Sequence, residues 1–89
     1  MQTTMNLLDA ALNVQTATDW CRELGLARNA LSVAKTRGHV SPAIAGAIAE
    51  KLNEDVDRWI AIAALESEKD SACKQRMLRR YRGSKNVGF

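Results

Sequence analysis

The chain has little of what several classes of small protein depend on. Its 89 residues include one proline, one histidine and two cysteines, and Cys21 and Cys73 form no Cys-x-x-Cys motif. A disulfide framework or a zinc site is therefore not expected. The first residues lack a basic segment followed by an apolar stretch, and the longest apolar run, 59–65, is far too short to span a bilayer. These absences predict a soluble cytoplasmic protein without membrane contact, metal, cofactor or small-molecule ligand.

The residue sets that enzymes use are also missing. No phosphate-binding glycine loop, Ser-His set or pair of cleft carboxylates is recognisable. Cys21 would need a neighbouring base to act as a nucleophile, and the only histidine, His39, is expected in a loop. His39 in turn has no second histidine or cysteine at ligand spacing. We therefore expect no enzymatic activity.

Acidic residues are absent from two long stretches. None lies between Glu23 and Glu50 or after Asp70, although the net charge is only +3 and four acids lie within residues 50–57. This segregation favours a polyanionic partner that faces the two acid-free stretches, and an uneven scatter of solvated charge is the alternative. The cations of the two stretches are Arg28, Lys35, Arg37 and His39 in the first, and Lys74, Arg76, Arg79, Arg80, Arg82 and Lys85 in the second.

The residues that are present favour helix. The chain is 46% hydrophobic and 26% charged, is rich in strong helix formers, and contains no alternating segment typical of a strand. Apolar periodicity predicts five helices over about 6–13, 17–24, 27–37, 42–52 and 56–68, the last of which can continue toward Tyr81. Thr16, Ser41 and Asp55 are expected to cap helix starts, and Gly25, Gly38 and Asn53 to end helices. The predicted fold class is all-α, with one domain over residues 1–68 and a basic C-terminal extension over residues 69–89.

Residues 17–36, ATDWCRELGLARNALSVAKT, satisfy the constraints of a helix-turn-helix. Cys21 supplies the small side chain that is needed where the second helix crosses the first. Gly25 tolerates the positive φ that a three-residue turn requires. The positions that must be buried between the two helices are all apolar, namely Trp20, Leu24, Leu26, Leu31 and Ala34.

This segment resembles the Cro and phage-repressor type of helix-turn-helix, the lambda-repressor-like DNA-binding domain. The resemblance covers about residues 5–66 and departs at Ala27, where the family often has a capping Ser or Thr. It also departs at Ala17, where a phosphate-binding Gln is frequent. The other matching features are the Leu31-Ser32 pair, Gly38, the Val40-Ser41-Pro42 segment, and the Ile48, Ala49 and Leu52 pattern.

The resemblance implies a five-helix domain that binds double-stranded DNA sequence-specifically. The short first helix and the basic end are similar to small phage or prophage transcriptional regulators, which act in the bacterial host cytoplasm. The family further implies a homodimer that acts as a repressor on a palindromic operator with half-sites about 34 Å apart.

In such a complex the second helix of the motif enters the major groove. Arg28 suits guanine, Asn29 suits adenine, and Val33 suits the methyl group of thymine. The expected base-reading residues are Arg28, Asn29, Ser32, Val33 and Thr36. The expected phosphate contacts are Thr16, Thr18, Lys35, Arg37, His39, Arg79 and Arg80. For each of these residues the alternative is an ordinary solvated side chain.

The predicted helix over 56–68 carries two apolar sets. Val56, Trp59, Ile60 and Ala63 form a stripe that is expected to pack on the domain. Ile62 and Leu65 point about 60° or more away from that stripe, so we expect them to be exposed. They predict a two-fold dimer interface, unless the C-terminal segment folds back and covers them. The full predicted interface is Ile62, Leu65, Met77, Leu78 and Tyr81.

Two other functions stay open. A phage-encoded protein-binding module can use the same fold to inhibit or redirect a host protein. Non-specific DNA packaging would need no base-reading residues. The absence of carboxylates around Arg28 and Asn29 favours DNA over a protein partner, and their capacity to read bases argues against packaging.

Overall fold

The computed structural model describes residues 3–83, and this part of the chain is all-helical, without strands. The predicted all-α class is confirmed. Residues 84–89, the end of the predicted C-terminal extension, lie outside the described residues. The helices are α1 (Thr4–Val14), α2 (Ala17–Leu24), α3 (Ala30–Arg37), α4 (Pro42–Lys51), α5 (Val56–Glu66) and α6 (Ala72–Gly83).

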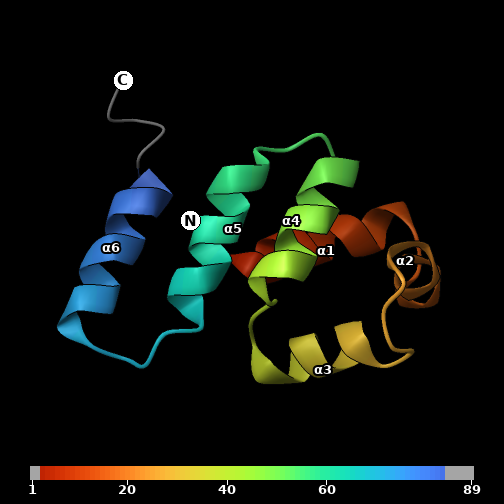
Figure 1. Cartoon of the computed structure of the whole chain (residues 1–89), viewed down its shortest axis with the longest axis horizontal. Helices are drawn as coiled ribbons and strands as arrows, with labels where there is room; N and C mark the ends of the chain where they lie inside the picture. The colour runs from red at the N-terminus through yellow and green to blue at the C-terminus, as the bar shows by residue number, and fades with distance from the viewer. Residues whose placement is uncertain (1–2, 84–89) are drawn as a thin grey trace.

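The helices α1, α4 and α5 form the centre of the molecule, and α4 packs closely on α5 (Figure 1). Figure 1 shows α2 and α3 at one end and α6 at the other, with α5 between α6 and α3. The core is continuous across α1 to α5. Its largest fully buried side chains include Leu8, Trp20, Leu31, Ile48 and Ile62.

The predicted helix caps of α2, α4 and α5 are confirmed. Each cap side chain accepts a backbone N–H from the first turn, which satisfies a donor that has no partner within the helix. The bonds are 3.1 Å from Asp19 to Thr16, 3.4 Å from Ile44 to Ser41, and 3.1 Å from Arg58 to Asp55.

The start of α1 and the end of α4 also have simple local causes. The helix α1 begins at Thr4, two residues earlier than predicted, because Thr3 and Asn6 form a reciprocal capping box. The helix α4 ends at Lys51, and Asn53 follows with a φ of 60°, a left-handed conformation that asparagine tolerates. Asn53 therefore closes α4 as expected.

The helix α5 ends at Glu66 and does not continue toward Tyr81. The exposed segment 67–71 reverses the chain, and α6 returns antiparallel along α5 (Figure 1). Hydrogen bonds join both ends of this pair. The amino group of Lys74 donates to the carbonyl oxygens of Glu66 at 3.1 Å and Glu68 at 2.9 Å, and Arg58 donates to the carbonyl oxygen of Tyr81 at 2.8 Å.

The position of α6 corrects the expected dimer interface. Ile62 is fully buried and Leu78 is 3% exposed, so neither side chain is available to a second copy. Leu65, Met77 and Tyr81 are half-buried. The prediction was wrong because α5 is covered on two sides, by α4 and by α6. A larger part of its circumference is therefore buried than a single stripe of apolar residues would indicate.

The buried face of α5 is correspondingly rotated. Ile60, which was expected in the core stripe, is 38% exposed, whereas Trp59, Ile62 and Ala63 are buried. Ile60 packs against Gly46, where an added Cβ would lie 2.8 Å from the Ile60 Cγ1 atom. Gly46 therefore allows the close approach of α4 and α5.

Among residues 3–83 no helix is both long enough and apolar enough to cross a membrane. The two cysteines are not joined to each other: Cys21 is buried and Cys73 is exposed. The same part of the chain holds no group of three or more His, Cys, Asp or Glu side chains able to bind a metal ion.

Candidate nucleic-acid interface

The chain reverses direction at Gly25, as predicted. Gly25 has φ 69° and ψ 33°, a left-handed conformation that a residue with a Cβ adopts at a cost. The N–H of Gly25 donates to the carbonyl oxygen of Arg22 at 3.4 Å, and that of Leu26 donates to Cys21 at 2.8 Å. This pair of bonds is the Schellman pattern of helix ends, and it fixes the direction in which the chain leaves α2.

The side chains expected between α2 and α3 lie on the inner side of both helices. Trp20, Cys21, Leu31 and Ala34 are buried, and the indole N–H of Trp20 donates to the carbonyl oxygen of Ala11 at 2.8 Å. Leu24 and Leu26 are half-buried and pack against the same core.

The turn between the two helices is longer than predicted. The helix α3 begins at Ala30 and not at Ala27, so five residues, 25–29, separate it from α2. Ala27 has no side-chain oxygen to cap a helix, and Asn29, at the cap position, makes no side-chain cap bond. A tight turn closed by the N–H of Ala30 and the carbonyl oxygen of Ala27, at 3.0 Å, leads into the helix. Arg28 and Asn29 therefore lie in the turn before α3.

All five predicted base-reading side chains are exposed. Val33 is 36% exposed, one of the few large apolar side chains on the described surface. The hydroxyl of Thr36 donates to the carbonyl oxygen of Ser32 at 3.1 Å, so toward a ligand Thr36 acts as an acceptor. The exposed set is Arg28 and Asn29 in the turn and Ser32, Val33 and Thr36 on α3.

The predicted phosphate-binding residues divide into three groups. Thr16, Thr18, Lys35 and Arg37 are exposed on or beside α2 and α3. His39 is half-buried instead, and its Nδ1 atom has no hydrogen-bond partner among the described residues. The last group is on α6, which Figure 1 shows separated from α3, and consists of the exposed Arg79 and Arg80.

A hollow of about 290 Å³ lies between α2 and the turn that follows it. Arg22 is a member of this hollow that sequence reasoning missed, although the helical spacing from Thr18 to Arg22 places both on one face. The guanidinium of Arg22 lies 3.4 Å from the carboxylate of Asp19 in an exposed ion pair. The lining residues are Thr18, Cys21, Arg22, Leu26 and Arg28.

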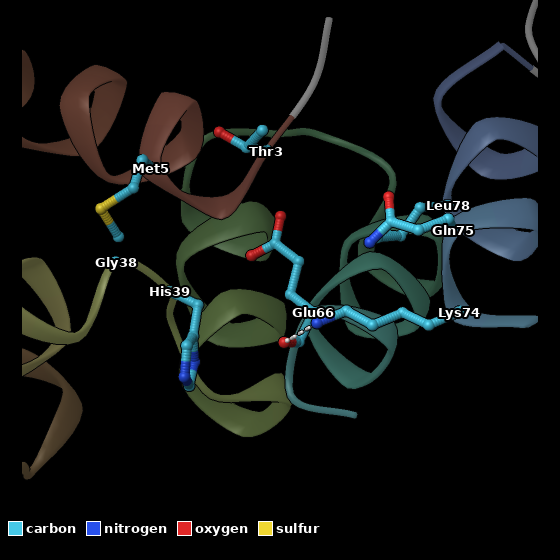
Figure 2. A pocket seen from close by; sticks show the side chains of 8 residues that line it. All are labelled: Thr3, Met5, Gly38, His39, Glu66, Lys74, Gln75 and Leu78. Atoms are coloured by element: carbon cyan, nitrogen blue, oxygen red, sulfur yellow. Dashed lines mark hydrogen bonds between the residues drawn. The ribbon is translucent and has the colours of Figure 1, made fainter. Parts of the chain in front are cut away.

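A second, larger hollow of about 400 Å³ lies between the start of α1, the loop after α3, the end of α5 and α6 (Figure 2). Figure 2 shows the side chain of Lys74 reaching across to the backbone of Glu66. No sequence motif marks this hollow, because its walls meet only when α6 folds back. The lining residues are Thr3, Met5, Gly38, His39, Glu66, Lys74, Gln75 and Leu78.

Comparisons with known proteins gave no match: no protein-family model, no curated protein and no solved structure matches this chain. The main physical feature of the candidate interface is the surface formed by α3 and the preceding turn, which carries hydrogen-bonding, cationic and β-branched side chains and no carboxylate.

Proposed function

We propose that this chain binds double-stranded DNA sequence-specifically and acts as a transcriptional regulator of the phage or prophage type, a repressor on a palindromic operator. In this proposal α3 enters the major groove with its first turn against the base edges. The resemblance to Cro and phage repressors implies this arrangement, and the exposed chemistry of the α3 surface supports it.

The observation that carries the proposal is the exposure of a complete set of groove-reading side chains. The Asn29 amide can bond adenine N6 and N7, and Val33 can pack on a thymine methyl group. Ser32 can donate or accept. The apolar partners of these residues on α3, Leu31 and Ala34, are buried, so the helix presents only its polar face and Val33.

Cations around α3 supply contacts that position the duplex. Lys35 and Arg37 are exposed in the last turn of α3, where the phosphate backbone would pass. Arg79 and Arg80 project from a helix that is separated from α3, so we assign them to a second, sequence-independent contact further along the duplex.

We further propose that the protein is a homodimer and that the exposed face of α5 forms the interface. Asp57, Ile60 and Ala64 follow helical spacing on that face and are all exposed. This face replaces the one centred on Ile62, which is fully buried in the core.

The test is selection of bound sequences from a random duplex library. We expect enrichment of one palindromic consensus whose half-sites lie about one helical turn apart. Even recovery of all sequences would favour non-specific packaging, and no recovery of DNA would favour the protein-binding alternative.

Two matched variants test whether the selected DNA binds at α3. Val33→Glu places a carboxylate on the exposed face of α3, and Val14→Glu places the same charge at the end of α1, where the side chain is 65% exposed. We expect the first variant to abolish enrichment and the second to preserve it. Equal behaviour of the two variants would contradict the assignment of the DNA-binding surface to α3.

A further inference from the structure

The 290 Å³ hollow beside α2 brings together two arginines that are six residues apart in the sequence. Thr18 and Arg22 are one helical turn apart on the same exposed face of α2, and the buried Cys21 lies beside that face. Beyond the reversal at Gly25, Leu26 and Arg28 form the opposite wall.

Local interactions hold the backbone around this hollow in place. The bond from the Leu26 N–H to the Cys21 carbonyl oxygen holds the chain against the end of α2. Cys21 is only 3% exposed, so the floor of the hollow is anchored in the core. The spacing between the Arg22 and Arg28 backbones is therefore set by the turn itself.

The charges in the hollow favour an anion. Two of its five lining residues are arginines and one is a threonine, and none of the five is acidic. Two cations that face one small space repel each other, and an anion between them relieves that repulsion. The exposed pair of Arg22 with Asp19, at 3.4 Å, is of a kind worth little in water, so Arg22 can exchange this partner.

The size of the hollow and the geometry of arginine define the class of ligand. A volume of about 290 Å³ is at the lower limit of the roughly 300–1,000 Å³ typical of small-molecule sites. Guanidinium groups bind phosphate oxygens through two parallel N–H bonds, and a threonine hydroxyl can donate a further bond. A single phosphate group fits this donor set.

We propose that the hollow binds one backbone phosphate of the DNA, so that Arg28 positions the duplex and does not read a base. This inference rests on the proposed DNA-binding function and refines it. Arg28 and Arg22 act together from opposite walls, and Thr18 completes the contact. The base-reading set is then Asn29, Ser32, Val33 and Thr36.

The experiment measures affinity for the selected duplex and for a scrambled duplex over a range of salt concentrations. We expect Arg22→Gln and Arg28→Gln each to weaken binding to both duplexes by the same factor. Each variant is also expected to reduce the slope of log affinity against log salt by about 0.9, the value for one lost phosphate contact. Lys69→Gln removes one charge from the exposed segment between α5 and α6 and should leave the slope unchanged.

A second measurement tests the hollow without DNA. Inorganic phosphate is titrated into the ¹⁵N-labelled protein at constant ionic strength, with chloride as the reference anion. We expect the amide signals of Thr18, Arg22, Leu26 and Arg28 to shift in the wild type and to shift less in the two arginine variants. Shifts that are spread over the whole surface, or that persist in both variants, would overturn the phosphate site.

The outcomes separate this inference from the function on which it rests. If Arg28→Gln weakens only the selected duplex and relaxes one base position, Arg28 reads a base and the inference is wrong, while sequence-specific DNA binding stands. If the wild-type protein binds neither duplex, the proposed function itself fails, and the assignment of the hollow to a DNA phosphate fails with it.

Discussion

Thr4 at the start of α1 donates both its backbone N–H and its hydroxyl to the carboxylate of Glu66 at the end of α5. The same hydroxyl accepts the backbone N–H of Val40 at 2.9 Å. Thr4 is fully buried, so one side chain joins the start of α1, the end of α5 and the loop that follows α3. The bond to Val40 thereby ties the loop between α3 and α4 to the core.

The connection gives a first prediction about stability. Thr4→Val keeps the shape of the side chain but leaves the buried Val40 N–H without its acceptor. We expect the free energy of unfolding to fall by about 1–3 kcal/mol, the usual cost of an unsatisfied buried donor. Urea denaturation followed by circular dichroism measures the change. The same substitution at the exposed Thr18 should change it by less than about 0.5 kcal/mol, and equal effects at the two sites would contradict the role of Thr4.

Signals within one helix or one turn were sufficient to predict several helix ends, although α3 begins three residues later than predicted. The caps at Thr16, Ser41 and Asp55 and the reversal at Gly25 each depend on bonds between residues a few positions apart. The exposure of the α3 surface followed from the apolar positions that had to be buried.

Long-range packing was not predictable in the same way. Periodicity assigns one buried stripe to a helix, but α5 packs against α1, α4 and α6, and the stripe that is buried contains Ile62 in place of Ile60. The bond between Thr4 and Glu66 spans 62 positions and has no sequence pattern. His39 was expected at the surface, and its partial burial in the larger hollow likewise depends on segments that meet only in the folded chain.

The two isoleucines of α5 give a second prediction. Ile60→Asp changes a side chain that is 38% exposed, so we expect a folded protein that sediments as a monomer. Ile62→Asp places a carboxylate in the core, where an unpaired charge is costly, and we expect loss of the folded state by circular dichroism. An unchanged dimer in Ile60→Asp would place the interface elsewhere.

The third prediction separates base contacts from backbone contacts. The Asn29 side chain makes no cap bond, so Asn29→Ala should leave stability almost unchanged. It should weaken binding to the selected site by about 1–3 kcal/mol and relax one base position. Arg79→Ala, on α6, should instead weaken all sequences alike and flatten the salt dependence. Sequence-independent losses from both variants would remove Asn29 from the base-reading set.

The last prediction concerns a carboxylate that joins α1, α2 and α4. A hydrogen bond from Gln15, at 2.8 Å, and the ammonium of Lys51, at 3.0 Å, lower the pKa of Glu23 below its ordinary value of about 4.5. Because the pKa is lower in the folded chain, the stabilisation is present above about pH 4.5 and is lost as the pH falls through the folded-state pKa. Lys51→Gln should therefore raise the pKa of Glu23 toward its ordinary value, measured by NMR titration of the carboxyl carbon. Lys35→Gln removes the same charge from α3 and should leave that pKa unchanged; if Lys51→Gln leaves it unchanged too, the ion pair does not form in solution.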